Sequence, residues 1–267
     1  ESGTRQSYSP TMPPPIKKIL VVKLCCIGDV IFLTPALRSL RRAFPSAAIS
    51  YLCASWVRDI VAQIPSVDNV IVYDAPYGSG RWAGRILETL NLLLRMRREH
   101  FDVMIIGHRS RFVPLFGWLS GIPRRIGFAD GASYFLTDSV RFRPGECETH
   151  RYQSLASVLH ASPDGDATEI RPFADELEAV DSLFAGWNIP DGDRVIGILP
   201  AGGENPGTIM HIKRWDPSNY AALCRKVLAQ FPVRLLLLGS MADRALNEEI
   251  LRTISDDSGR IMDVSGR

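Results

Sequence analysis

The chain has 267 residues, of which 46% are hydrophobic and 22% charged, a composition typical of a soluble globular protein with one large or two smaller domains. No apolar run approaches the roughly 18 residues that a membrane-spanning helix requires, so no transmembrane segment is predicted. The net charge of +2 hides an asymmetry: residues 1–150 carry 19 Lys and Arg against 12 Asp and Glu, whereas residues 151–267 carry 12 against 17. A basic first part suits an anionic partner such as a phosphorylated glycolipid or a membrane surface, although ordinary scatter of charge explains it equally well.

The N-terminal segment and the cysteines suggest no targeting signal, metal site or disulfide. Residues 1–15 are Pro-rich and lack the apolar region of a secretory signal, so we interpret them as a disordered lead-in. The cysteines have no zinc-type spacing, and the adjacent Cys25 and Cys26 are poor disulfide partners. Reduced thiols in a cytoplasmic protein are therefore expected.

Strand-like and helix-like patterns alternate along the first part of the chain. We expect strands at 18–24, 48–52, 70–74 and 101–107, separated by a helix that carries Leu33, Leu37 and Leu40 at helical spacing and by helices at 56–63 and 84–98. This order predicts a parallel sheet that is covered on both faces. Shorter elements follow: a helix at 112–121, strands at 124–128 and 139–142, and a helix at 149–160.

The polar stretch ASPDGDATEIRP (161–172) is interpreted as a linker to a second β/α unit. There we expect helices at 173–186, 217–231 and 243–254, and strands at 194–203, 233–240 and 261–266. The predicted domains are 16–170 and 171–267, the second with about three strands. Ligands of open α/β sheets gather at the carboxyl ends of the strands, so two such domains suggest an enzyme with its site in the cleft between them.

Asp29 is a lone carboxylate at the point where the first strand turns into the first helix. On position alone it is either an N-cap, which this spacing favours, or a general base that faces the cleft. Gly28 would let the backbone turn tightly at this point. Lys23, near the end of an apolar strand, is either a lysine that extends to solvent or a ligand for anionic groups. Pro35 leaves open whether the helix starts there or begins earlier and bends.

The stretch ILVVKLCCIGDVIFLTPALRSLRRAFPSAAISYL (19–52) resembles the opening of the heptosyltransferases of lipopolysaccharide synthesis, glycosyltransferase family nine. SVDNVIVYD, GIPRRIGF and AGG…KRWDPSNYAALCRKVL resemble later segments of that family, and the resemblance covers most of residues 18–266. It implies a GT-B fold with two Rossmann-like β/α/β domains, an acceptor domain followed by a nucleotide-sugar donor domain. It also implies an inverting, metal-independent transfer of heptose from ADP-heptose to a lipopolysaccharide inner-core acceptor, without a further cofactor.

The resemblance also implies roles for individual residues. Asp29 becomes the catalytic base, and Lys23 lies near it and near anionic groups of the acceptor. The Gly202-Gly203 turn and Lys213 hold the donor diphosphate, and Asp243 contacts the nucleoside. The alternatives are an exposed Lys213 before a helix that Asp216 caps, and an Asp243 that serves as the N-cap of helix 243–254. The implied location is cytoplasmic, peripheral to the inner membrane.

Arginines in two expected loops could bind the acceptor. Arg81 and Arg85 precede or begin one helix, and Arg109 and Arg111 follow the fourth strand. They form either a phosphate-binding acceptor wall or ordinary solvated surface charge. Neither His108 nor His150 belongs to a metal-binding pattern, so both are interpreted as structural or adjacent to the acceptor.

Other classes of protein remain as alternatives. The main alternative is a non-catalytic α/β protein that binds a nucleotide or a phosphate. It differs from the enzyme in that it would need no base in a cleft. No G-x-G-x-x-G follows a predicted strand, which disfavours a dehydrogenase, and no recognised motif supports a nucleic-acid partner. The family's second signature, Asp-Ser/Thr-Gly-x-x-His-Leu-Ala, does not occur, so residues 1–267 are expected to be an incomplete view of a longer protein. The sugar, the acceptor hydroxyl and the oligomeric state stay open.

Overall fold

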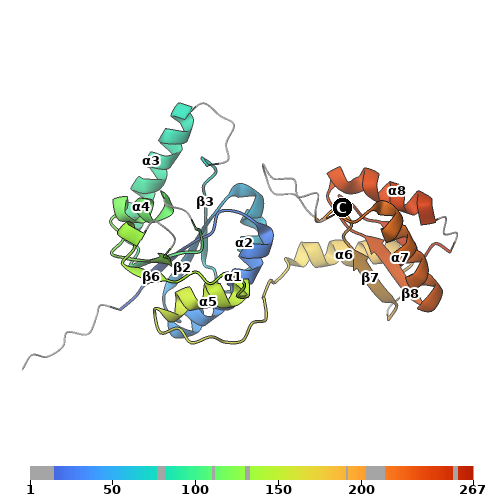
Figure 1. Ribbon diagram of the computed structural model, residues 1–267, viewed down its shortest axis with the longest axis horizontal. Helices are drawn as coiled ribbons and strands as arrows, with labels where there is room; N and C mark the ends of the chain where they lie inside the picture. Colours follow the sequence, from blue (N-terminus) through green and yellow to red (C-terminus); the bar gives the residue numbers. More distant parts are fainter. Residues whose placement is uncertain are drawn as a thin grey trace, which may run out of the picture. The chain divides into compact units, whose positions relative to one another are not determined.

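The computed structural model describes residues 15–76, 82–109, 112–129, 133–190, 192–202, 214–254 and 258–266 (Figure 1). The chain divides into two compact units, residues 1–172 and residues 173–267. The lead-in predicted for residues 1–15 lies outside the described residues except at Pro15.

The first unit is built on a six-stranded parallel sheet with the strand order β3-β2-β1-β4-β5-β6. Its strands are β1 (Lys18–Val22), β2 (Ala48–Cys53), β3 (Asn69–Val72), β4 (Val103–Ile106), β5 (Arg124–Phe128) and β6 (Asp138–Val140). Its helices are α1 (Ile27–Ala43), α2 (Arg58–Ala62), α3 (Trp82–Glu99), α4 (Phe112–Leu119) and α5 (Glu148–Ser157), with short 3₁₀ turns at Ser55–Val57 and Ser133–Phe135.

Helices cover both faces of this sheet, as the sequence predicted. Successive residues of a strand point to opposite faces, so β1 contributes to two cores. Ile19 and Val21 pack with side chains of α1, α2 and α5, whereas Leu20 and Val22 pack with side chains of α3 and α4. Figure 1 shows α3 and α4 on the side of the sheet opposite to α1, α2 and α5.

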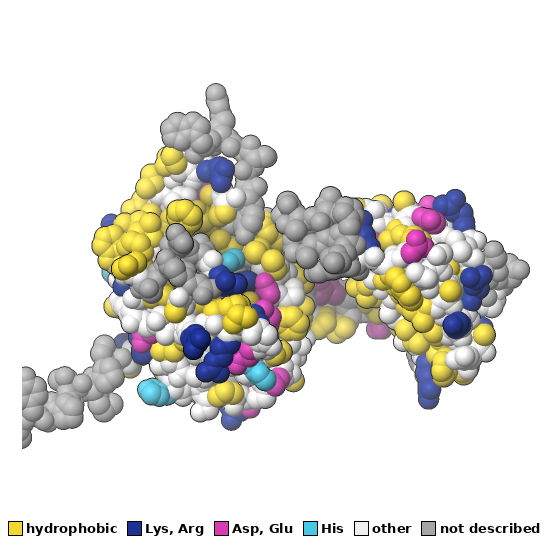
Figure 2. Space-filling model, in the orientation of Figure 1, with side chains coloured by type: hydrophobic (Ala, Val, Ile, Leu, Met, Phe, Trp, Pro, Cys, Tyr) yellow, Lys and Arg dark blue, Asp and Glu magenta, His cyan; other side chains and the backbone are white. Residues whose placement is uncertain are grey.

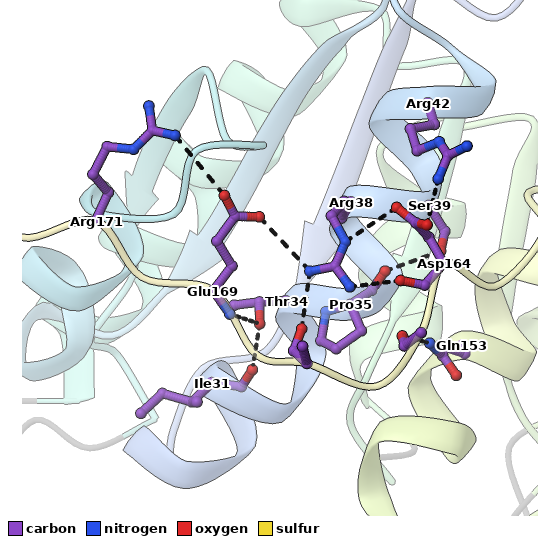
Figure 3. Close-up of polar contacts among 12 residues, drawn as sticks. Ile31, Thr34, Pro35, Arg38, Ser39, Arg42, Gln153, Asp164, Glu169 and Arg171 are labelled. Atoms are coloured by element: carbon purple, nitrogen blue, oxygen red, sulfur yellow. Dashed lines mark hydrogen bonds and ion pairs between the residues drawn. The ribbon is translucent and has the colours of Figure 1, made fainter.

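Helix α1 continues through Pro35 because Thr34 replaces the hydrogen bond that proline cannot make. Proline has no N–H, so the carbonyl of Ile31, four residues earlier, lacks its usual partner. The Thr34 hydroxyl donates to that carbonyl at 2.7 Å (Figure 3). The same Thr34 oxygen accepts the backbone N–H of Glu169 at 2.9 Å. The helix therefore begins early, at Ile27, of the two possibilities that the sequence left open.

The polar stretch 161–172 is anchored on the first unit rather than free. Arg38 of α1 donates to the backbone carbonyls of Asp164 and Ala167 at 2.8 and 2.9 Å, and its Nε lies 3.3 Å from the Asp164 carboxylate. Arg42, one helical turn further, also pairs with Asp164 (Figure 3). At the far end of the stretch, the Arg171 N–H donates to the carbonyl of Gln63 at 2.9 Å.

The second unit has a three-stranded parallel sheet with the order β7-β8-β9. Its elements are α6 (Ala174–Gly186), β7 (Arg194–Ile198), α7 (Pro217–Gln230), β8 (Val233–Leu237), the 3₁₀ turn η4 (Met241–Asp243), α8 (Arg244–Ile254) and β9 (Ile261–Asp263). Helices α7 and α8 cover one face of the sheet, and α6 packs on the other. The predicted N-cap is confirmed, because Asp216 accepts the Ser218 N–H at 2.9 Å with Pro217 as the first residue of α7.

The two units confirm the predicted α/β fold class with two Rossmann-like β/α/β parts. The predicted elements differ from the observed ones mainly at their ends. The strands predicted at 101–107 and 233–240 are shorter than expected, since pairing stops where the neighbouring strand stops, which a local pattern does not show. Among the helices in the described ranges, none combines the length and apolar character required to cross a bilayer.

Candidate active site

The candidate site is built at the carboxyl end of β1, where the backbone keeps sheet-like bonding for two more residues. The N–H of Lys23 donates to the carbonyl of Leu52 at 3.2 Å, and the carbonyl of Leu24 accepts the N–H of Ala54 at 2.9 Å. These bonds to the segment around β2 fix the backbone from which the Lys23 side chain projects.

The bend into α1 is made by Cys26 and not by Gly28. Cys26 has φ +72°, in the left-handed region that residues other than glycine seldom adopt. Gly28 already lies inside the first turn of α1, after the bend. Our expectation that Gly28 provides the tight turn is therefore wrong. A Cβ atom placed on Gly28 would meet no heavy atom within 4 Å. The space beside Gly28, the residue that precedes Asp29, is therefore open.

Asp29 is a first-turn residue of α1 and not its N-cap. The N-cap position belongs to Cys26, whose side chain makes no capping hydrogen bond. The alternative in which Asp29 caps the helix is therefore wrong. A carboxylate in the first turn lies at the positive end of the helix dipole, which favours an anion there. The role of Asp29 as a base stays a prediction.

Lys23 and Asp29 form an ion pair across the bend, with Nζ 2.8 Å from Oδ2. The Lys23 side chain is only 9% exposed, so it does not extend to solvent as one alternative required. Burial acts to lower the pKa of Lys23, but the neighbouring Tyr152 and Asp29 more than offset it, and the pKa is raised above its usual value. Lys23 is thus a buried, charged partner of the Asp29 carboxylate.

Tyr152 is a site residue that the sequence did not suggest. It comes from α5, is 3% exposed, and lies under Lys23, whose Nζ is 5.9 Å from the centre of the ring. Burial raises the pKa of its phenol to about 12. Gly107 lies against Leu33 and this ring, since a Cβ atom there would come within 3.2 Å of Leu33 and would touch Tyr152 at 3.4 Å. The helical spacing of α5 predicts that Tyr152 is buried, but not beside which residue.

His108, two residues after the end of β4, supports the same bend. Its Nε2 accepts the backbone N–H of Leu24 at 2.5 Å, so the ring is neutral and carries its proton on Nδ1. Burial and the nearby charge of Lys23 lower the pKa of His108 to about 4. Of the two interpretations offered for this histidine, the structure supports the structural one.

The two cysteines at the bend are free thiols. Their sulfur atoms lie 3.3 Å apart and hydrogen-bond to each other, well beyond the ~2.05 Å of a disulfide. Burial and the neighbouring Cys25 raise the pKa of Cys26 to about 11, which keeps it protonated near neutral pH. A thiol nucleophile at this position is not supported.

The predicted arginine wall is described only in part, because Arg81 and Arg111 lie outside the described residues. Arg85 is on α3 and donates its Nε to the carbonyl of Ala75 at 2.6 Å. Arg109 stacks on the ring of Phe142, with its guanidinium carbon 4.1 Å from the ring centre. Both arginines thus have structural contacts, and their binding of an acceptor stays a prediction.

In the second unit, two of the four predicted donor residues are described, whereas Gly203 and Lys213 lie outside the described residues. Gly202 follows β7 with φ +72°, the left-handed conformation that a glycine turn requires. Asp243 accepts the N–H and the hydroxyl of Ser240 at 2.8 and 2.7 Å and closes the 3₁₀ turn before α8. Ser240 is the N-cap of this turn, and Asp243 is its last residue, directly before α8.

The structure therefore brings Lys23, Asp29, Tyr152 and His108 together at one end of the first sheet. In the second unit, Asp263 occupies the end of β9, where it accepts from Asn247 at 2.9 Å and from the Ser265 N–H at 2.9 Å. The sequence analysis did not single it out. Within the described ranges, no three His, Cys, Asp or Glu side chains gather as they would around a metal ion.

The curated proteins that resemble this chain in sequence and are described below are all heptosyltransferases. The chain is 26% identical to lipopolysaccharide heptosyltransferase 2 of Escherichia coli K12 over 250 residues, which cover 90% of this chain and 68% of that protein. It is 25% identical to the enzyme of the same name from Salmonella typhimurium, with the same coverage. It is 26% identical to lipooligosaccharide heptosyltransferase 2 of Haemophilus ducreyi, over 91% of this chain and 69% of that protein. No family model matches the chain.

Solved structures agree on the fold. A family nine glycosyltransferase from Veillonella parvula matches with a TM-score of 0.75 at 21% identity, over 94% of this chain and 69% of that chain. The E. coli ADP-heptose lipopolysaccharide heptosyltransferase II matches with a TM-score of 0.72 at 22% identity, over 93% and 72% of the two chains. The fold is the GT-B type that the sequence resemblance implied. With the curated relatives, which are 25–26% identical over about 90% of this chain, the chain is a distant homologue of the lipopolysaccharide heptosyltransferases of glycosyltransferase family nine.

Proposed function

We propose that this chain is an inverting, metal-independent glycosyltransferase that moves heptose from ADP-heptose to the inner core of a lipopolysaccharide precursor. The observation that carries the proposal is the Lys23–Asp29 pair at the carboxyl end of β1 in a homologue of the family nine heptosyltransferases. The names of the curated relatives, each a heptosyltransferase, support the choice of sugar. The reaction would take place on the cytoplasmic side of the inner membrane, with an anionic glycolipid as the acceptor.

In this mechanism Asp29 removes the proton from the acceptor hydroxyl as the hydroxyl oxygen attacks the anomeric carbon of the donor. The new carbon–oxygen bond forms on one face of the sugar, and the bond to the diphosphate breaks on the other, so the configuration inverts and ADP leaves. Oδ2 of Asp29 is engaged by Lys23. We assign the acceptor hydroxyl to Oδ1, since a carboxylate can accept at both of its oxygens.

Lys23 acts as a positioning residue in this proposal. Its buried ammonium group holds the Asp29 carboxylate in one orientation, and the ring of Tyr152 lies beneath it. The neutral His108 fixes the backbone at Leu24 without adding a second positive charge. The arrangement orients the base before the acceptor arrives, which is how a site gains from pre-organisation.

The donor and acceptor contacts extend the proposal to residues at other strand ends. Lys213 and the Gly202-Gly203 turn would hold the donor diphosphate, because a lysine and free backbone N–H groups bind phosphate oxygens well. Asp243 would contact the nucleoside. Gly28, Arg81, Arg85, Arg109 and Arg111 would line the path of the anionic acceptor. Calorimetry with ADP tests the donor part: Lys213→Ala should weaken ADP binding by roughly 1.5–3 kcal/mol, and unchanged affinity would assign the diphosphate to other residues.

The function itself is tested with a panel of activated sugars. The full chain is incubated with a deacylated inner-core acceptor and with ADP-heptose, ADP-glucose, UDP-glucose or GDP-mannose, and the mass of the product is measured by mass spectrometry. We expect the acceptor to gain the mass of one heptose with ADP-heptose and no mass with the other three donors. Transfer from another donor would change the proposed substrate, and binding of ADP with no transfer to any acceptor would favour the non-catalytic nucleotide-binding protein instead.

A further inference from the structure

Helix α3 turns an apolar stripe toward solvent. Ile86, Leu90 and Leu94 follow each other at intervals of four residues, so they lie on one side of the helix. These three residues are 47%, 48% and 50% exposed, and the adjacent Leu87 is 61% exposed. A helix on a globular protein normally buries such a stripe against the core.

The inward side of the same helical turns is partly polar. Oε1 of Glu88 accepts the backbone N–H groups of Asp74 and Ala75 at 2.8 and 3.1 Å. The hydroxyl of Thr89 lies 2.8 Å from the hydroxyl of Tyr73. These contacts fix the rotation of the helix about its axis. The apolar stripe is therefore held outward by specific hydrogen bonds and is not exposed through loose packing.

Helix α4 extends the apolar surface. Phe112 and Trp118 are 71% and 54% exposed, and Tyr134, in the turn beside α4, is 94% exposed. Figure 2 shows hydrophobic side chains gathered over α3 and α4. A pocket of about 620 Å³ lies between the two helices and the ends of the strands beneath them, lined mostly by apolar residues that include Leu90, Phe116 and Leu24 and also by His108. We call this region, formed by α3, α4 and residues 133–135, the α3–α4 surface.

Positive charge lies beside this apolar region. Arg95, Arg97 and Arg98 are all exposed near the end of α3. The Nε of Arg97 donates to the carbonyl of Leu119 at 3.0 Å, which places that guanidinium at the end of α4. Exposed leucines, an exposed tryptophan and adjacent arginines are the combination found on helices that lie in the interface of an anionic bilayer.

We propose that the α3–α4 surface docks on an anionic lipid bilayer, with the apolar stripe among the acyl chains and the arginines at the lipid headgroups. The inference deepens the proposed function and rests on it for its purpose, because a glycolipid acceptor resides in a membrane. Its physical basis is independent of catalysis: contiguous apolar surface at exposed positions is costly in water and marks a contact surface. The charge of the arginines selects an anionic bilayer rather than an apolar protein partner.

The test is co-sedimentation of the full chain with vesicles, without nucleotide or acceptor. Phosphatidylcholine vesicles are compared with vesicles that also contain phosphatidylglycerol. We expect binding to the anionic vesicles, weakened by added salt, and little binding to phosphatidylcholine alone. Leu87→Gln with Leu94→Gln should weaken binding on the order of tenfold, since both side chains are already exposed and their loss should not unfold the protein. Arg95→Gln should weaken it about fivefold.

The matched control exchanges two leucines of the second unit, Leu177→Gln with Leu223→Gln, which are 53% and 40% exposed. This variant should bind vesicles like the parent. Equal loss in both double variants, no binding by the parent, or binding without dependence on anionic lipid would each overturn the proposal. Sedimentation velocity tests whether a second copy of the chain occupies the surface instead. If the parent is a dimer and only the Leu87/Leu94 double variant is a monomer, the surface is a dimer interface and not a membrane-binding one. Vesicle binding with no sugar transfer would leave this inference standing while the proposed function fails.

Discussion

The Nζ atom of Lys23 lies 2.8 Å from Oδ2 of Asp29, and the two side chains differ in access to solvent, the lysine 9% exposed and the aspartate 29%. The cation is enclosed, whereas the carboxylate still faces outward. A base needs this combination, because its orientation must be fixed while one oxygen stays within reach of a substrate.

Replacing the lysine tests the pair. Lys23→Met keeps the length of the side chain and removes the charge. We expect turnover to fall, because the carboxylate loses the group that orients it, and stability at pH 7 to fall by about 1–2 kcal/mol, because Asp29 loses its ion-pair partner but keeps contact with water. Urea unfolding and a transfer assay of the same preparations give both quantities.

The pH dependence of that stability difference has a definite sign. The pKa of Lys23 is raised in the folded protein above its usual 10.5. Its contribution is therefore complete below pH 10.5 and is lost as the pH rises through the folded-state pKa. The gap between parent and Lys23→Met should stay constant from pH 7 to pH 10 and shrink only at higher pH. A gap that closes by pH 9 would mean that Lys23 is not charged in the way that the ion pair requires.

His108 gives the opposite dependence, in acid. Burial and Lys23 lower its pKa from 6.5 to about 4, so the unfolded chain binds a proton at pH values where the folded protein does not. The parent should therefore lose about 2–3 kcal/mol of stability between pH 7 and pH 4.5 in addition to what His108→Gln loses. Glutamine retains an oxygen that can accept the Leu24 N–H. Parallel stability curves for the two proteins over this range would contradict the neutral, buried histidine.

Thr34 should matter for folding and not for transfer. Its hydroxyl donates to Ile31 and accepts from Glu169, so Thr34→Val, which is nearly isosteric, leaves two backbone groups without partners. We expect a loss of about 1–3 kcal/mol in the free energy of unfolding with little change in the turnover of the folded enzyme. Thr34→Ser keeps the hydroxyl and should lose less. Equal losses in the two variants would show that the methyl group, and not the hydrogen bonds, stabilises this position.

The sequence predicted the elements well because burial leaves a local pattern. Apolar runs predicted the strands of both sheets, and Asp216 followed by Pro217 predicted the start of α7. The order of the strands could not be predicted in the same way. Which strand pairs with which depends on contacts between segments far apart in the chain, and these leave no periodic signal.

The candidate site was predicted in part for the same reason. Asp29 and Lys23 are close in sequence on either side of a strand-to-helix turn, so the sequence of that turn is enough to identify both as candidate site residues. Tyr152 comes from a distant helix, and only the packing of α5 on α1 brings it under Lys23. The bend was assigned to Gly28 because glycine adopts positive φ readily, but the backbone there is helical and Cys26 takes the left-handed conformation.

The turnover of Asp29→Asn tests the central claim most directly. Asparagine is nearly isosteric but cannot accept the proton, so the account predicts a loss of at least ~100-fold with unchanged ADP affinity and an unchanged unfolding midpoint. Asp59→Asn, an exposed acid in the first turn of α2, is the matched control and should transfer sugar like the parent. Turnover of Asp29→Asn within a few-fold of the parent, or a loss fully explained by unfolding, would contradict the assignment of Asp29 as the base.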